Sequence, residues 1–483
     1  MASRPGQRDL TAGPIGKTLL AFAVPTLVSS VVQSLNGSVN AIWVGRFLGE
    51  EALAATSNAN LVMFLVMAFV FGFGMAATVL VGQAFGRRDV DAARRAVGTA
   101  IGGFLPVAVS IAVIGWVGAP ALLDWLATPE AVQPLALAYL RIIFLAMPAM
   151  LILIVLVMAL RGSGDAMTPL WFMLVAVLLD AGLNPVFILG LGPAPELGIA
   201  GSALATVIAN FTALAGLLVY IYRRNLPLRL RGPELAYLRP DRALLGTMLR
   251  KGLPMGLQMI VVSASGLAML GLVNREGVHT TAAFGVALQL WTYIQMPAMA
   301  LGAAASAMVA QNIGADRWDR VRSITGSAIL FNIVITGLIV ALLLVVDRPA
   351  LALFLGGDSP ALPIARHIHL LASWSFILFG ITMVIFGTVR ANGSVLGPLI
   401  ILAIGLFPIR FGIVFALRPW FGADALWLSF PVSSFVNMAM AIAFYLHGGW
   451  RKSRMQAPPP SSEECVEEAI ASAEPGGRMN PAG

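Results

Sequence analysis

One carboxylate, Asp180, lies deep inside an apolar stretch and is the first candidate for chemistry. It follows Pro169 by 11 residues, which places it about 17 Å along a helix that rises about 1.5 Å per residue. Asn184 shares its helix face, and Pro185 removes a backbone donor beside it. A carboxylate shielded from water can bind a proton near neutral pH, or a sodium ion where further oxygens surround it. We therefore predict a cation-binding site at Asp180, with simple hydrogen bonding between helices as the alternative.

Arg410 is the most conspicuous charge in the apolar stretches of the second half of the chain, where it lies beside Pro408. A charge inside a bilayer is expensive, so such an arginine should face a cavity or a cluster of carbonyl groups. We expect Arg410 to brace the carboxyl-terminal half, and repulsion of a cationic ligand is the alternative role. Arg141 has a similar setting, and we assign it no role.

The composition identifies the elements that must hold these residues. Of 483 residues, 58% are hydrophobic and only 11% are charged, and the mean hydropathy is +0.86. Each bilayer crossing needs roughly 20 apolar residues, so this length accommodates about twelve helices with short loops. The sequence therefore predicts an all-α polytopic membrane protein and argues against a nucleic-acid-binding protein despite the net charge of +8. The single cysteine excludes disulfides within the chain.

Twelve apolar runs divide the chain into lobes and linkers. We predict a cytoplasmic amino terminus at 1–15, a six-helix lobe at 16–222, a basic cytoplasmic linker at 223–252, a second six-helix lobe at 253–448 and a disordered acidic tail at 449–483. Most Lys and Arg residues fall on one set of loops, which the positive-inside rule makes cytoplasmic. Both termini are then cytoplasmic, in a multi-pass protein of the cell inner membrane. The predicted spans are 16–44, 52–82, 96–120, 131–159, 169–191, 198–222, 253–274, 280–311, 325–346, 361–388, 397–418 and 424–448.

The two halves of the sequence repeat. Pro25 and Pro254 are 229 residues apart, and VGQAFGRRDVDAARRAVGTA resembles VAQNIGADRWDRVRSITGSA. LRGSGDAMTPL likewise resembles VRANGSVLGPL. Because each half has an even number of helices, both begin on the same side of the membrane. This predicts two parallel six-helix bundles related by an axis along the membrane normal, with a site between them.

Several segments in this order resemble the multidrug and toxic compound extrusion (MATE) family, and they look closest to its DNA-damage-inducible, DinF-like branch. They are AVPTLVSSVVQSLNGSVNAIWVGRFLGEEALAA, the paired VGQAFG and VAQNIGA, LRGSGDAMTP and FGVALQLWTYIQMPAMALG. The resemblance covers about residues 15–450. It implies a two-lobed antiporter that exports cationic or amphipathic compounds in exchange for protons or sodium ions, without an enzyme activity or a cofactor.

The resemblance also implies a cation-coupling cluster in the amino-terminal lobe. Helix 5 of this branch usually reads Asn-x-x-x-Asp-Pro, but here it reads DAGLNP, and Asn40 stands where helix 1 carries an acid. Tyr139 and Thr206 match further polar positions of the cluster. Because one carboxylate remains instead of two, and sodium sites usually use more anionic oxygen, protons are the favoured coupling ion. The predicted coupling residues are Asp180, Asn184, Asn40, Tyr139 and Thr206.

Other residues are candidates for substrate contact and for bending. Gln289 and Gln295 belong to a polar arc of one helix, and flexible Met side chains suit a promiscuous apolar cavity. We predict a cavity lined by Gln33, Met259, Gln289, Trp291 and Gln295, with buried hydrogen bonding between helices as the alternative for the arc. Pro25 lies where family members bend helix 1, and a static kink is the alternative.

Two other functions remain open at this point. A lipid-linked oligosaccharide flippase of the same superfamily would have a strongly cationic cavity, whereas only Arg410 and Arg141 are predicted as buried basic residues. An integral-membrane enzyme would need clustered His, Asp or Glu near one membrane face, and no such cluster or metal site is evident. The expected partners are a small amphipathic or cationic substrate and membrane lipids, with the protein acting as a monomer and binding no nucleic acid.

Overall fold

We describe a computed structural model of the chain, which covers residues 8–455 except 126–127, 131 and 192–194. The described residues form helices and connecting turns, with no strand among them. Within the described part of the chain, eleven helical segments are long and apolar enough to cross a membrane, or twelve if the bent pair Ala361–Ala372 and Ser375–Arg390 is one span. The all-α, polytopic fold predicted from composition is therefore confirmed.

The described residues of the first half form α1 to α5, of which α1 makes two crossings. In α1 the helical geometry breaks at Gly49 (φ 84°), where glycine tolerates a backbone that other residues avoid. The two crossings of α1 are Ile15–Gly49 and Val62–Gly86. The helices are α1 (Ile15–Gly86), α2 (Val90–Trp125), α3 (Gln133–Gly162), α4 (Met167–Leu189) and α5 (Ile199–Arg223).

The second half repeats this order with more interruptions. Its spans are α6 (Arg242–Val273), α7 (Val278–Gly314), α8 (Trp318–Val345), the α10–α11 pair (Ala361–Ala372, Ser375–Arg390), α12–α13 (Leu396–Ile404, Arg410–Phe421) and α14 (Asp424–His447), with α9 (Asp347–Leu355) between spans. A π-helical turn, Gly405–Ile409, joins α12 to α13. The turn contains Pro408, which cannot donate a backbone hydrogen bond.

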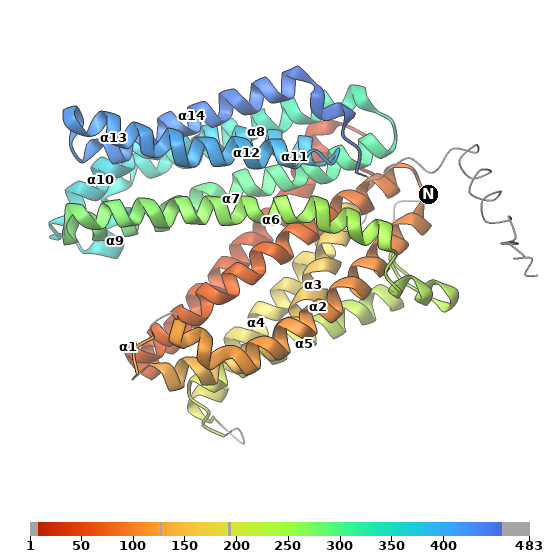
Figure 1. Cartoon of the computed structure of the whole chain (residues 1–483), viewed down its shortest axis with the longest axis horizontal. Coiled ribbons are helices and arrows are strands. Elements are labelled where there is room, and N and C mark those ends of the chain that lie inside the picture. Colours follow the sequence, from red (N-terminus) through yellow and green to blue (C-terminus); the bar gives the residue numbers. More distant parts are fainter. Residues whose placement is uncertain (1–7, 126–127, 131, 192–194, 456–483) are drawn as a thin grey trace, which may run out of the picture.

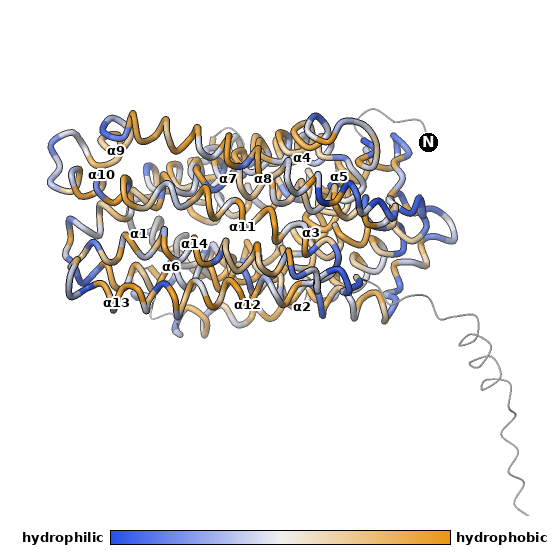
Figure 2. Tube along the Cα trace, turned by 90° about the horizontal axis from the view of Figure 1, so that it is seen from above, coloured by the Kyte–Doolittle hydropathy of each residue, from blue (hydrophilic) through white to orange (hydrophobic). Residues whose placement is uncertain are grey.

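Figure 1 shows two bundles that lie against each other at one end of the molecule and diverge toward the other, with α2–α5 in one bundle and α7–α14 in the second. Figure 2 shows hydrophobic residues along the middle of the helices and hydrophilic residues gathered at the two ends. This pattern is expected of a helical protein whose middle lies in the hydrocarbon of a bilayer.

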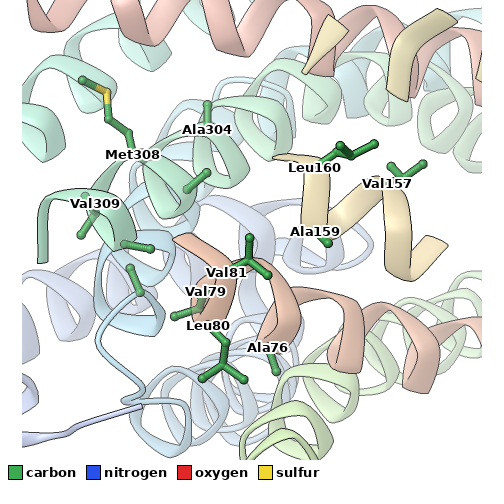
Figure 3. Close-up of a cluster of buried hydrophobic side chains, with 14 of the residues drawn as sticks. Ala76, Val79, Leu80, Val81, Val157, Ala159, Leu160, Ala304, Met308 and Val309 are labelled. Carbon is green, nitrogen blue, oxygen red and sulfur yellow. The ribbon is translucent and has the colours of Figure 1, made fainter. Parts of the chain in front are cut away.

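The buried apolar residues divide in the same way as the bundles. One cluster draws on both halves, for example Leu80 of α1, Leu160 of α3 and Met308 of α7, which Figure 3 shows together. A second cluster, which includes Val44 and Tyr139, belongs to the first half alone. A third, which includes Trp291 and Phe430, belongs to the second half alone. The halves therefore share a core at the closed end and have separate cores at the diverging end.

Small and polar residues hold the closed end together. Gly86 packs on the carbonyl of Gln311, and Gly314 packs in the same way on the carbonyl of Gln83. The Gln83 amide donates to the Ala391 carbonyl (2.7 Å), and the Gln311 amide donates to the Gly162 carbonyl (2.9 Å). The paired glycines and glutamines of the sequence repeat thus meet at the contact between the two halves.

Two boundaries differ from the sequence-based expectation. Helix α6 begins at Arg242, within the predicted linker 223–252, because Asp241 caps it by accepting from the backbone N–H groups of Ala243 and Leu244. Pro254, expected near a helix start, therefore lies inside its helix, as Pro25 does.

The predicted tail 449–483 begins with an ordered segment. Trp450 is buried and stacks on Tyr445, and its carbonyl accepts from the Asn392 amide (3.0 Å). Residues 449–455 are thus fixed against the bundle, and the rest of that tail lies outside the described residues, as do residues 1–7 of the predicted amino-terminal segment.

Candidate cation site in the amino-terminal lobe

Asp180 is buried between three helices. It belongs to α4 and retains only 3% of its exposed surface. Its Oδ2 accepts from Asn36 Nδ2 of α1 (2.9 Å), and its Oδ1 accepts from Thr206 Oγ1 of α5 (3.0 Å). Asn184, one turn further along α4, donates to the Asp180 backbone carbonyl (2.9 Å) and more weakly to Oδ1 (3.3 Å). The carboxylate therefore ties α1 and α5 to α4.

The donors around Asp180 are all neutral. Among the described residues, no lysine or arginine forms an ion pair with this carboxylate. A buried carboxylate without a cationic partner is costly to keep ionised, even when neutral groups donate to it. The site therefore suits a positive charge that no described residue supplies.

Two amide oxygens beside the carboxylate lack partners. Asn36 Oδ1 and Asn184 Oδ1 are fully enclosed, and neither accepts a hydrogen bond from a described residue. Buried polar atoms are normally paired, so unpaired ones indicate strain, an unseen water or a ligand. Together with the Asp180 carboxylate they form a group of oxygens that could coordinate a small cation.

Asn40 and Tyr139 form a neighbouring group. Asn40 Oδ1 accepts from Ser202 Oγ of α5 (2.7 Å), and the buried Tyr139 hydroxyl is hydrogen-bonded to the Asn40 side chain. Asn40 has no hydrogen bond to Asp180 among the contacts described. The structure thus brings all five predicted coupling residues into one region of the lobe, but the helix-1 partner of the carboxylate is Asn36.

Sequence reasoning missed Asn36, although a signal was present. Asn36 and Asn40 are four residues apart, as are Asp180 and Asn184, so each pair lies on one helix face. Two such pairs on helices predicted to share a site favour a contact between the four side chains. Without knowing how far α1 is displaced along α4, however, the sequence cannot choose between Asn36 and Asn40.

A second acid, Asp165, was also not anticipated as buried. It lies outside the spans, in the loop before α4, and is 3% exposed. Its Oδ1 accepts from the backbone N–H groups of Met167 and Thr168, and its Oδ2 accepts from Thr168 Oγ1 (2.6 Å). Burial raises the pKa of this carboxyl, while the Thr168 bonds act in the opposite direction. Asp165 caps α4 and takes no part in the Asp180 site.

Arg410 is buried in the carboxyl-terminal lobe, at 8% exposure. Its Nε donates to Ser433 Oγ of α14 (3.1 Å), and its Nη1 approaches Ser265 Oγ of α6 (3.3 Å). The guanidinium also lies over the Phe430 ring, 4.6 Å from the centroid. These contacts connect three helices of the second lobe.

The predicted cavity residues do not share one environment. Gln33 and Gln289 are exposed, and Met259 and Gln295 are half-buried, so all four remain candidates for contact with a substrate. Trp291 does not line a cavity as predicted, because it is 1% exposed and belongs to the aromatic core of the second lobe. Its indole N–H donates to Ser373 Oγ (2.9 Å), and its ring packs 5.0 Å from that of Phe430. An amphipathic pattern alone does not distinguish such a core position from a cavity wall.

Pro25 is buried in a part of α1 that is helical on both sides of it. Within α1 the backbone departs from helical geometry at Gly49 and remains helical at Pro25. Bending of α1 at Pro25 stays a prediction.

No group of three or more metal-ligating side chains occurs among the described residues.

Comparison with known proteins agrees with the two-lobed arrangement. A family model described as MatE matches residues 25–186 and 254–416, one match in each half. The probable multidrug resistance protein YoeA of Bacillus subtilis is 35% identical over 443 residues, which cover 91% of this chain and 95% of that protein. An FAD transporter of Shewanella oneidensis is 26% identical, with coverage of 91% and 95%.

Solved structures share the fold. One, described as the outward-facing conformation of a multidrug resistance MATE family transporter of the MOP superfamily, superposes with a TM-score of 0.84 at 21% identity. The match covers 93% of this chain and 98% of that one. Another, described as MATE in the straight conformation, superposes with a TM-score of 0.81 at 22% identity and the same coverage.

Proposed function

The chain belongs to the MATE family of multidrug efflux transporters, and on this premise we propose that it is an antiporter that exports cationic or amphipathic compounds in exchange for a cation bound at Asp180. Members of this family are transporters, so a membrane enzyme is excluded. The observation that carries the proposal is the buried Asp180 carboxylate, which is surrounded by neutral donors and has no cationic partner among the described residues.

The coupled ion acts by changing the charge of Asp180. While the carboxylate is ionised, Asn36 donates to it and holds α1 against α4. A bound cation neutralises the carboxylate, which weakens this bond and frees α1 to change its position. An ion shifts a conformational equilibrium only by the difference in its affinity for the two states. Asp180 provides such a difference if its contact with α1 exists in one state only.

The energy of one proton is sufficient for export. A proton moving through about 100 mV releases about 2.3 kcal/mol, and each unit of pH difference adds about 1.4 kcal/mol. Concentrating a neutral compound tenfold requires about 1.4 kcal/mol. One proton per neutral substrate molecule therefore supports a concentration ratio well above tenfold. Exchange of one proton for one monovalent cation moves no net charge, so the pH difference alone drives it.

We favour the proton because Asp180 is the only carboxylate among the contacts of this site. Sodium is the second candidate, and a specific observation favours it. The unpaired oxygens of Asn36 and Asn184 would supply two neutral ligands beside the carboxylate. The transport experiment below distinguishes the two ions.

We also propose that the closed end of the molecule faces the cytoplasm in the cell inner membrane. Arg317 and Arg320 at this end donate to the carbonyls of Thr11 and Gly13 near the start of the described chain. The positive-inside rule places such basic segments on the cytoplasmic side. The bundles then diverge toward the outside, and a single chain is the transporting unit because it contains both lobes.

Transport by the purified protein in proteoliposomes tests the proposal. Uptake of a fluorescent organic cation is measured under a proton gradient and, separately, under a sodium gradient at clamped pH. We expect the proton gradient to drive transport and Asp180→Asn to abolish it, because the amide cannot carry the exchanged charge. The matched control is Asp358→Asn, which alters an exposed acid in the second lobe. Transport driven by sodium alone would reassign the ion, and equal transport by Asp180→Asn and wild type would overturn the role of Asp180.

A further inference from the structure

Arg410 lies in the middle of a membrane-spanning segment, and no described residue compensates its charge. It lies within the span Leu396–Phe421 and is 8% exposed. Its partners are two hydroxyl groups and an aromatic ring, and no carboxylate among the described residues pairs with it. A buried cation with neutral partners alone is unfavourable, because removal from water is compensated only by an anion or a full set of acceptors.

The two serines are fixed as acceptors toward the guanidinium. Ser265 Oγ donates its own hydrogen to the Leu406 carbonyl (3.0 Å). Ser433 Oγ donates to the Phe430 carbonyl (3.1 Å). Each hydroxyl has one hydrogen, so only its lone pairs remain for Arg410. The serines therefore orient the guanidinium without neutralising it.

Part of the guanidinium has no hydrogen-bond partner among the described residues. An arginine carries five N–H donors, and the contacts described use Nε and Nη1. No Arg410 nitrogen is among the fully enclosed polar atoms that lack a partner. Since Nη2 has no partner among the described residues, it must lie in the small part of the side chain that remains exposed. The guanidinium therefore keeps a donor that no described residue satisfies and that an anion could accept from.

An aromatic cluster fixes the ring beneath the guanidinium. Phe430 lies beneath the guanidinium, and the rings of Trp291 and Phe284 lie 5.0 and 6.3 Å from that of Phe430. All three rings belong to the buried core of the second lobe, so they surround Arg410 with an apolar environment. A charged guanidinium attracts an oxyanion more strongly in such an environment than in water.

We propose that Arg410, oriented by Ser265 and Ser433, is an anion-binding site that accepts the carboxylate of an amphipathic substrate. The planar guanidinium matches the geometry of a carboxylate and binds it through charge-assisted hydrogen bonds. This inference rests on the proposed export function and names the residue that would recognise the acidic group of a substrate. An inorganic anion such as chloride shares the same chemistry and is the second source of the ligand.

A matched pair of dyes tests the site in the absence of any gradient. A rhodamine with a free carboxylate and the ethyl ester of the same dye share the cationic ring system, and the ester replaces the anion by a neutral group. Binding to the full-length protein in lipid nanodiscs is measured by fluorescence anisotropy in gluconate buffer. We expect the wild type to bind the acid about tenfold more tightly than the ester, the size of one charge-assisted hydrogen bond.

Variants at Arg410 should remove this preference. Arg410→Gln is expected to bring the ratio of the two affinities close to one, and Arg410→Lys, which keeps the charge, should retain part of it. The control is Arg141→Gln, because Arg141 lies over the Trp116 ring of the other lobe and should leave the ratio unchanged. If Arg410→Gln does not fold, the ratio in Arg410→Lys and in Ser433→Ala decides the question.

Exchange of gluconate for chloride at constant ionic strength shows whether the site binds an inorganic anion or only the carboxylate of a substrate. Competition by chloride in the wild type that is lost in Arg410→Gln assigns the site to small anions as well as carboxylates. No competition assigns it to the substrate carboxylate. Equal binding of acid and ester by the wild type, or an unchanged preference in the Arg410 variants, would overturn the proposal. Failure of ion-driven transport with an intact dye preference would instead count against the antiport mechanism alone.

Discussion

The two lobes carry opposite charges at related places in the repeat. Asp180 lies in the fifth span of the first half, and Arg410 lies in the corresponding span of the second half. Each is more than nine-tenths buried, and each is held by neutral groups from neighbouring helices. Amides and a hydroxyl donate to Asp180, whereas hydroxyls accept from Arg410. Each bundle therefore has a buried polar site at the same place in the repeat, but the buried charge is negative in the first bundle and positive in the second.

The closed end shows the opposite behaviour, because there the two halves are nearly equivalent. Gly86 meets the Gln311 carbonyl as Gly314 meets the Gln83 carbonyl. We call this contact of Gly86 and Gln83 with Gln311 and Gly314 the joint. Because both lobes share the joint, both copies of the repeat must keep the same packing there. The separate lobe cores lack that shared constraint, so their charges can diverge. Experiments can therefore test whether the lobes are alike at the joint and unlike at the sites.

The largest effect is expected from substitution at the joint. A Cβ at Gly86 would lie 2.0 Å from the Gln311 carbonyl oxygen, and one at Gly314 would lie 2.1 Å from that of Gln83. Since the clash is with backbone, we expect Gly86→Ala and Gly314→Ala each to destabilise the protein by about 3 kcal/mol, near the upper end of overpacking effects. Thermal unfolding in detergent measures both, and the two losses should be similar.

Gly326→Ala is the control for the glycine pair. Gly326 lies in α8 with nothing within 4 Å of an added Cβ. Alanine there should raise stability slightly, because glycine is the poorer helix former. A large loss at Gly86 with none at Gly314 would contradict the equivalence of the two halves at the joint.

A smaller and local effect is expected at the two asparagines of α1. Asn36→Ala removes a charge-assisted hydrogen bond to Asp180, worth about 1.5–3 kcal/mol, so ion-driven transport at limiting ion concentration should fall about tenfold or more. Asn40→Ala breaks a bond to Ser202 and leaves the carboxylate contacts intact. The initial rate of uptake compares the two variants, and an equal or larger loss in Asn40→Ala would show that the carboxylate site is centred elsewhere.

Much of the fold and part of the site could be predicted from the sequence. Hydrophobicity indicated the spans, and the rarity of acids in apolar stretches singled out Asp180. The start of α6 was missed because its first turns are polar, and hydropathy detects only the apolar part of a helix. Segment spacing revealed the repeat because insertions between the matched motifs are few.

The partners of the buried charges were harder to predict. Asn36 meets Asp180 across 144 positions of sequence, and Ser265 meets Arg410 across 145. Serine and asparagine occur in many helices of this chain and carry no charge, so the sequence does not single out the ones that meet a buried charge. Only the relative displacement and rotation of packed helices decides which of them reaches a charged partner.

The smallest effect separates the two loops that the repeat aligns, RGSGD and RANGS. Asp165 of the first accepts from the backbone N–H groups of Met167 and Thr168, whereas no side chain caps α12, which follows the second. We expect Asp165→Ala to lower stability by about 1 kcal/mol, the usual value of a helix cap. Ser394→Ala, the change in the second loop, should have almost no effect. A loss at Ser394 as large as that at Asp165 would mean that the loops are equivalent after all.

The Asp165 carboxyl should also make the stability of the protein depend on pH. Ser394, at the corresponding position of the second loop, does not titrate and adds no such dependence. Because burial raises its pKa, the folded protein binds a proton there at pH values at which the unfolded chain does not. Its contribution to stability is therefore fully present below the ordinary pKa of an aspartic acid and is lost as the pH rises through the raised pKa. Asp165→Asn keeps an acceptor for the cap but cannot titrate. The unfolding temperature of the wild type relative to that of Asp165→Asn should thus rise as the pH is lowered from neutral. If the difference between the two unfolding temperatures stays constant with pH, the first loop is as insensitive to protons as the second.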